Sequence, residues 1–187
     1  MNEITKMLIV LSVISGVCGF LLAGVRMGTM DRIEEQVLVN VQGPAVNKAL
    51  DGSTNDLLKD RKKIMVNGKE LVVFIGKKEN KPWSYAFETT GKGFGGDLGV
   101  ITGFYMDSDS VSGIGITACK ETPGMGTRVK EKIFTNSFIN RDFKTDFNVD
   151  KDGGAIDGVT GATVSSRGVC EAVRKAIDMS KDVRAKL

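Results

Sequence analysis

The feature that most constrains this chain is an uncharged apolar run near its beginning. Residues 7–25 read MLIVLSVISGVCGFLLAGV, nineteen residues without a charge between Lys6 and Arg26. As an α-helix with a rise of about 1.5 Å per residue, this run is about 28 Å long, close to the ~30 Å hydrocarbon core of a bilayer. A cleaved signal peptide has a shorter apolar run, of about 7–15 residues, followed by a small-x-small site that is missing here. We therefore predict an uncleaved, single-pass anchor over residues 1–26, embedded in the lipid bilayer.

The charges beside this anchor give a weak signal for its orientation. Only five residues precede Lys6, and they include Glu3. Short N-terminal tails normally stay on the cytoplasmic side. We therefore expect the cell (inner) membrane as the location, with residues 27–187 on the extracytoplasmic side.

The rest of the chain predicts an α+β fold. Residues 27–50 are expected to form a helical stalk, in which residues 27–39 continue the membrane helix and a short helix follows Gly43 with Pro44 in its first turn. Beyond residue 50 the apolar pattern predicts strands over residues 63–66, 71–75, 83–88, 98–106 and 111–117.

The connections and helices of this domain also leave signals in the sequence. The first two strands are joined by Asn67-Gly68, a strong hairpin signal. A short helix is expected over residues 130–140 and a turn over 150–154. An apolar stripe at helical spacing predicts a long helix from Thr163 to about Arg184. Strands followed by a helix indicate a mostly antiparallel sheet.

Composition excludes several classes of site. The 187 residues include no histidine, which rules out a Ser-His-Asp triad, a Cys-His pair and an imidazole zinc site. Three cysteines are too few for a four-thiolate metal site, so we predict no metal centre and no catalytic side chain. The net charge of +3 is spread along the chain and does not suggest nucleic-acid binding. Cys119 and Cys170 have two possible states, a disulfide in an exported domain or two thiols, and we expect thiols.

Three glycine-rich segments are too dense to be simple connections: Gly91–Gly96, Lys120–Gly126 and Asp157–Ser166. The third leads directly into the predicted long helix. The first turn of a helix has unpaired N–H groups and the positive end of the helix dipole, which favour an anion such as phosphate. A plain helix start, with Thr163 or Ser165 as the N-cap, is the alternative.

The third segment, D-G-V-T-G-A-T-V-S-S, resembles the flavinylation motif D-x-x-S/T-G-A-T of a family of FMN-binding subunits. This family serves two related membrane machines, the Rnf (or Rsx) ion-translocating electron-transport complex and the Na⁺-pumping NADH:quinone oxidoreductase. In the family, a flavin transferase joins FMN to the last threonine of the motif through a phosphoester bond. The resemblance implies covalent FMN on Thr163, with Asp157, Thr160, Gly161 and Ala162 around it.

The two other segments extend the resemblance. K-E-T-P-G-M-G is similar to the E-T-P-G-L-G segment that lies against the isoalloxazine ring, and G-K-G-F-G-G is similar to a G-x-G-Y/F-x-G loop. This implies flavin contacts from Glu121, Thr122, Gly124, Met125, Gly126 and Phe94. For Phe94, a place in the core of the domain is the alternative. Glu121 is expected either to hydrogen-bond the ring edge or to be solvated in a plain turn.

Lys151 has two expected roles of equal weight. It places a positive charge near the N1/C2=O side of the flavin, where it would stabilise the reduced anion, or it is a solvated turn lysine. Cys119 departs from the family pattern, because many relatives have histidine at or near its position. Met125 replaces the usual leucine, and Thr160 replaces the commoner serine and keeps the hydroxyl.

The resemblance also implies a function. Residues 51–187 would be an FMN-binding domain that relays electrons in a complex coupling ferredoxin and NAD⁺ to ion movement. Its partners would be the A, D and E membrane subunits, the peripheral iron–sulfur and flavin subunits of types B and C, and the flavin transferase. The length favours the G subunit of the Rnf type over the longer C subunit of the Na⁺ pump. The alternatives are that C subunit or a membrane-anchored FMN module for sensing or assembly.

Overall fold

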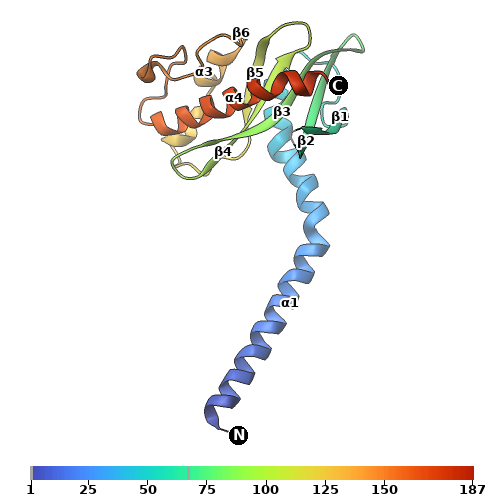
Figure 1. Ribbon diagram of the computed structural model, residues 1–187, viewed down its shortest axis with the longest axis vertical. Helices are drawn as coiled ribbons and strands as arrows, with labels where there is room; N and C mark the ends of the chain where they lie inside the picture. Colours follow the sequence, from blue (N-terminus) through green and yellow to red (C-terminus); the bar gives the residue numbers. More distant parts are fainter. Residues whose placement is uncertain (1, 67) are drawn as a thin grey trace. The chain divides into compact units, whose positions relative to one another are not determined.

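The computed structural model describes residues 2–66 and 68–187 (Figure 1). The chain divides into two units, Met1–Leu38 and Val39–Leu187. The first unit is helical and the second contains the sheet.

The first unit consists of the helix α1, Glu3–Val37. None of its 35 residues is buried. An 18-residue window in this helix has a mean hydropathy of 2.5, so the helix is long and apolar enough to cross a membrane. The prediction of an apolar helix at this place is confirmed.

Two short helical elements follow α1 in the chain. A π-helical turn, η1 (Leu38–Gln42), leads into α2 (Gly43–Ala49). We expected Gly43 to separate two helices, but it is the first residue of α2. Pro44 lies in the first turn, as predicted, where its missing N–H is not needed. Ala45, Val46 and Ala49 of α2 are buried.

One antiparallel sheet of six strands, in the order β1-β2-β3-β4-β5-β6, forms the centre of this unit. The strands are β1 (Arg61–Val66), β2 (Lys69–Lys78), β3 (Lys81–Lys92), β4 (Asp97–Tyr105), β5 (Ser110–Ile116) and β6 (Arg141–Asp142). The predicted antiparallel sheet is confirmed, but β6 was missed and β3 was predicted too short because its ends are polar. Asn67 of the predicted hairpin turn lies outside the described residues.

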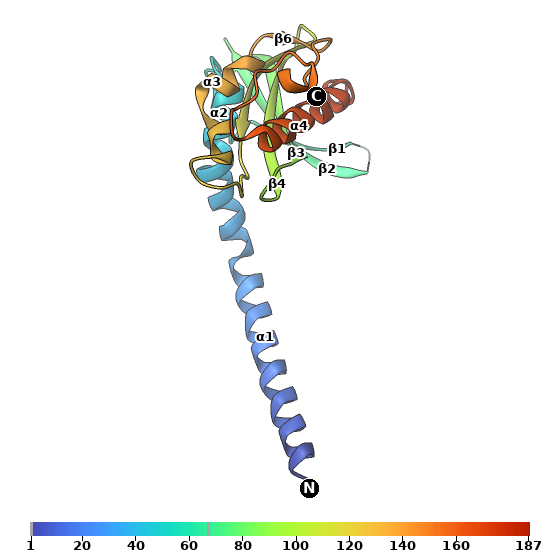
Figure 2. The ribbon, with the colours of Figure 1, turned by 90° about the vertical axis from the view of Figure 1, so that its left-hand side faces the viewer.

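The long helix α4, Thr163–Arg184, agrees with the prediction from the apolar stripe. It packs on β3 and β4, while α2 packs on β4 and β5. Figure 2 shows the sheet between these two helices. The aromatic core under α4 includes Tyr85, Phe87 and Phe104.

The helix predicted over residues 130–140 is broken into three short pieces. These are η2 (Gly126–Lys130), α3 (Lys132–Thr135) and η3 (Asn136–Phe138). The break falls at Glu131, whose φ of −67° and ψ of 145° are extended. Phe134 and Phe138 still reach the core. Burial of these two rings therefore needs no continuous helix.

Two glycines allow α4 to lie very close to β3. A Cβ atom on Gly91 would lie 1.8 Å from the carbonyl oxygen of Gly168, and one on Gly168 would lie 2.4 Å from that of Lys92. No side chain fits at such distances. This contact brings the first half of α4 against the end of β3, next to the β3–β4 hairpin loop, so these glycines serve protein packing.

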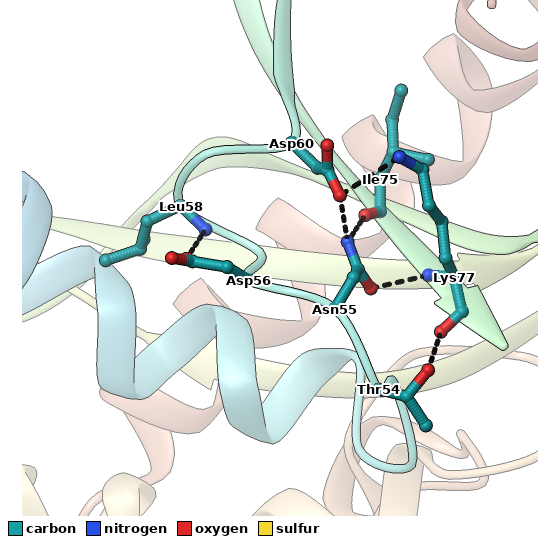
Figure 3. A network of polar contacts seen from close by, with 7 residues as sticks. All are labelled: Thr54, Asn55, Asp56, Leu58, Asp60, Ile75 and Lys77. Carbon is teal, nitrogen blue, oxygen red and sulfur yellow. Dashed lines mark hydrogen bonds and ion pairs between the residues drawn. The ribbon is translucent and has the colours of Figure 1, made fainter. Parts of the chain in front are cut away.

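A polar network fastens the segment before β1 to strand β2 (Figure 3). The amide nitrogen of Asn55 donates to the Asp60 carboxylate at 2.7 Å and to the carbonyl of Ile75 at 2.9 Å. Its amide oxygen accepts the N–H of Lys77 at 2.7 Å, and Thr54 donates to the carbonyl of Lys77 at 3.1 Å. Every polar atom of the Asn55 side chain is thus used in holding the fold.

Candidate functional site

Glu121 joins the three glycine-rich segments. Its side chain is only 6% exposed. One carboxylate oxygen accepts the N–H of Gly95 at 3.2 Å, and the other accepts the hydroxyl of Ser165 at 2.8 Å. The first, second and third segments therefore meet at one buried carboxylate. Neither expected role of Glu121 includes this one, in which the carboxylate binds protein donors inside the domain.

The start of α4 differs from the expected capped helix. The N-cap is Ala162, which has no side-chain cap, and Thr163 is the first helical residue. The alternative in which Thr163 or Ser165 is the N-cap is therefore wrong. The hydroxyl of Ser166 instead accepts the N–H of Val159 at 3.0 Å and donates to the carbonyl of Ala162.

The hydroxyl groups of this segment differ in accessibility. Ser165 is 2% exposed and Ser166 is fully buried, and both hydroxyls are engaged inside the domain. Thr163 is half-buried and Thr160 is exposed. Thr163 alone of the four combines an accessible hydroxyl with a place in the first turn of α4, where the helix dipole favours a negative charge.

Lys151 lies beside Thr163. Its Nζ is 3.4 Å from the Thr163 Oγ1. Lys151 belongs to the one-turn helix η4, Asp150–Asp152, inside the predicted turn at 150–154. The N–H of Gly158 donates to the Asp150 carboxylate and lowers its pKa. The Arg167 guanidinium likewise lowers the pKa of Asp152.

Three apolar side chains on the glycine-rich segments and on the first turn of α4 are exposed. Phe94 is 78% exposed, Met125 55% and Val164 44%. A Cβ atom on Gly161 would lie 3.8 Å from the Cγ of Met125, so Met125 borders the approach to α4. Such surface suits a flat apolar ring.

The other predicted residues of the second and third segments differ in exposure. Thr122 and Gly124 are exposed, and the N–H of Gly124 donates to the Thr127 hydroxyl at 3.0 Å. Gly126 is buried against Glu121. Asp157 is exposed and Ala162 is buried.

Sequence reasoning missed two features of the site. The carboxylate of Asp152 binds Arg167, which follows Thr163 by four residues on the same face of α4. The i, i+4 spacing of Thr163 and Arg167 was the signal for their shared helix face, but the pairing with Asp152 left none, because Asp152 is 15 residues from Arg167. The Gly91–Gly168 contact left no signal, because it joins residues far apart in the sequence.

Cys119 and Cys170 are both free thiols, as expected. Burial raises the pKa of the Cys170 thiol to about 12. This thiol is therefore protonated at neutral pH and is unsuited to act as a nucleophile.

The model of the FMN-binding domain family matches residues 93–178. This match covers slightly less than half of the chain. The match begins in the β3–β4 hairpin loop and ends within α4, so it includes Glu121, Lys151 and Thr163.

Among curated proteins, the chain is similar to the G subunit of the ion-translocating oxidoreductase complex of two bacteria. The Haemophilus influenzae protein is 29% identical over 181 residues, which cover 90% of this chain and 86% of the relative. The Vibrio cholerae protein is 32% identical over 117 residues, 59% of this chain and 56% of the relative. The matched part thus spans about half the length of the Vibrio relative.

Among solved structures, the fold is similar to the C subunit of Na⁺-translocating NADH-quinone reductase. The Parabacteroides distasonis structure has a TM-score of 0.50 and 22% identity, covering 68% of this chain and 67% of that one. The Shewanella oneidensis NqrC structure has a TM-score of 0.50 and 19% identity, covering 67% and 65%. These likenesses establish the fold.

The residues at the start of α4 fit an FMN group. The Thr163 hydroxyl and the Lys151 ammonium are suited to its phosphate end, because a phosphate oxygen prefers a cation and N–H donors. The exposed side chains of Phe94 and Met125 are suited to its ring. A charged end beside an apolar surface matches the two ends of FMN.

Proposed function

We propose that this chain is a membrane-anchored flavoprotein subunit that relays electrons within an Rnf-type ion-translocating oxidoreductase complex. The observation that carries the proposal is the similarity to the G subunit over 90% of the chain, together with the match of residues 93–178 to the FMN-binding domain family. Thr163 lies within this match as the first residue of α4. The chain acts as part of the complex, and we expect no catalysis by the isolated subunit.

We further propose that FMN is bound covalently, through a phosphoester bond to Thr163 made by a flavin transferase. Covalent attachment suits the start of α4, because Thr163 is accessible while Ser165 and Ser166 are buried and hydrogen-bonded. When bound, FMN supplies the redox chemistry. Glu121 holds the three segments together, and Phe94 and Met125 would supply exposed apolar surface for the ring.

The proposed setting is the cell (inner) membrane. α1 crosses the bilayer once and the FMN domain lies on the extracytoplasmic side. The partners are the A, D and E membrane subunits and the peripheral B-type and C-type subunits of the same complex. A covalent bond retains the flavin on the extracytoplasmic side, where a non-covalently bound flavin would dissociate and be lost from the cell.

Co-expression of the full chain with a flavin transferase tests attachment. The intact mass should rise by one FMN less one water. Thr163→Ala should abolish the gain, whereas Thr163→Ser keeps a nucleophilic hydroxyl and should be modified. An unmodified wild-type chain under these conditions would refute the assignment.

A second experiment separates electron transfer from a sensing or assembly role. The purified complex is given reduced ferredoxin or NADH, and the absorbance of the bound flavin is followed. A relay predicts that the flavin changes redox state. A flavin that stays unchanged would favour the sensing or assembly module.

A further inference from the structure

We infer that η4 is a positioning element for the phosphate end of FMN. Asp150 and Asp152 fasten the turn so that Lys151, between them, holds its ammonium beside the Thr163 hydroxyl. The inference rests on the proposed attachment of FMN to Thr163. It assigns Lys151 to the phosphate end, whereas the sequence left open a place near the flavin ring and a solvated turn.

The contact between Lys151 and Thr163 is the starting point. The Lys151 Nζ donates toward the Thr163 Oγ1 over 3.4 Å. An ammonium group is a compact point charge with three donors and is a common ligand of phosphate oxygens. Lys151 is exposed and flexible, so its place beside Thr163 depends on the contacts that fix the turn.

The first contact that fixes η4 is an ion pair between Asp152 and Arg167 of α4. Arg167 binds both carboxylate oxygens of Asp152, at 2.7 Å from Nε and 2.6 Å from Nη2. Arg167 follows Thr163 by one helical turn, and residues four apart lie on the same helix face. The residue next to Lys151 is therefore held on the face of α4 that carries Thr163.

A second set of contacts joins η4 to the segment before α4. The Asp150 carboxylate accepts the N–H of Gly158 at 2.9 Å, and the Asp150 N–H donates to the carbonyl of Ile156 at 2.8 Å. Val149 and Ile156 form an isolated parallel bridge. Together these bonds fix the turn to the same segment that leads into Thr163.

These contacts are poorly explained by stability alone. Asp152 and Arg167 are exposed, with side chains 36% and 51% accessible. Exposed ion pairs contribute only about 0–1 kcal/mol to folding. The contacts of Asp150 and Asp152, on either side of Lys151, instead restrict the positions that the flexible Lys151 side chain can reach.

The attachment step shows what Lys151 contributes. A bond forms between the Thr163 Oγ1 and the phosphorus of a flavin dinucleotide, the pyrophosphate P–O bond breaks, and AMP leaves with its electron pair. The hydroxyl proton passes to solvent or to a base of the transferase. Lys151 does not take this proton, because an ammonium has no lone pair. It offsets the negative charge of the phosphate during the step and in the product.

The test measures the rate of modification of the purified full chain in detergent, with flavin transferase and flavin dinucleotide, by intact mass. Lys151→Gln should slow modification about tenfold, the loss expected for one charge-assisted hydrogen bond. Lys151→Arg should recover most of the rate. The wild-type rate should fall as salt rises, and the Lys151→Gln rate should depend less on salt.

The role of the Asp152–Arg167 ion pair is tested by Asp152→Asn and by the double variant that also carries Lys151→Gln. Asp152→Asn should slow modification, and the double variant should be no slower than Lys151→Gln alone, because both act through the same ammonium. The matched control is Asp109→Asn, which breaks the 2.7 Å ion pair with Arg184 in the last turn of α4. This control should be modified at the wild-type rate.

The outcomes separate this inference from the proposed function. If the wild-type chain is not modified, the proposed attachment fails. If the wild-type chain is modified and Lys151→Gln matches it in rate and salt dependence, only the role of η4 is overturned. A double variant slowed by the product of the two single effects would overturn the positioning role of Asp152.

Discussion

Two polar regions of the domain use their side chains in opposite ways. Both amide atoms of Asn55 bind groups on β2 and on Asp60, so this side chain has no atom left for a ligand (Figure 3). At the start of α4, Thr163 and Lys151 are held in place but remain accessible. The comparison separates polar groups that hold the fold from polar groups that the fold presents to a ligand.

Substitution of Glu121 should have the largest effect on stability and on FMN attachment. Its carboxylate both holds the fold together and joins the segments of the proposed FMN site. Glu121→Ala leaves the buried Ser165 hydroxyl and the Gly95 N–H without their acceptor. We expect a loss of about 3 kcal/mol in the free energy of unfolding, together with slower FMN attachment. Chemical denaturation and intact mass measure the two effects. Glu131→Ala, an exposed glutamate, is the control, and equal behaviour of the two variants would contradict the joining role of Glu121.

Asn55→Ala should separate stability from attachment. Removing the amide deletes three hydrogen bonds, so we expect a loss of about 2 kcal/mol in the free energy of unfolding. FMN attachment should proceed at the wild-type rate. Asn47→Ala, on an exposed position of α2, is the control. Slower attachment in Asn55→Ala at a temperature where the chain is folded would show that the Asn55 contacts also serve the attachment site.

Acid should lower the free energy of unfolding by protonating Asp60, a partner of Asn55. The Asn55 amide, followed by the Lys77 ammonium, lowers the pKa of the Asp60 carboxyl. A carboxyl with a lowered pKa in the folded state contributes stability above its unfolded value of about 3.9, and that contribution is lost as the pH falls through the folded value. Stability followed from pH 6 to pH 2 should fall less steeply in Asp60→Asn than in the wild type. Identical slopes would contradict this contribution.

Phe94→Ala should have the smallest effect on the fold. Its side chain is 78% exposed, so the free energy of unfolding should change by less than about 0.5 kcal/mol. Aromatic stacking quenches flavin emission, so we expect the fluorescence of bound FMN to rise. Ile133→Ala, at a position 88% exposed, should leave the fluorescence unchanged. Unchanged fluorescence in Phe94→Ala would remove this ring from the site.

Local sequence patterns predicted most helices and strands, whereas the contacts that form the candidate site join residues far apart in the sequence. The apolar stripe placed α4 within its observed bounds, since a helix face is visible in consecutive residues. Glu121 could not be placed in this way, because its partners lie 26 and 44 residues away. The helix expected around Glu131 failed because two buried rings satisfied the pattern without a continuous helix.

Thr163 is the proposed attachment point, and fragmentation of the modified peptide identifies the residue that carries FMN. Trypsin cleavage after Lys151 and Arg167 gives a peptide of residues 152–167 with four hydroxyl side chains. We predict that FMN is found on Thr163, with Ser165 and Ser166 unmodified because they are buried. Flavin on Thr160, Ser165 or Ser166, or a peptide without flavin, would contradict the account.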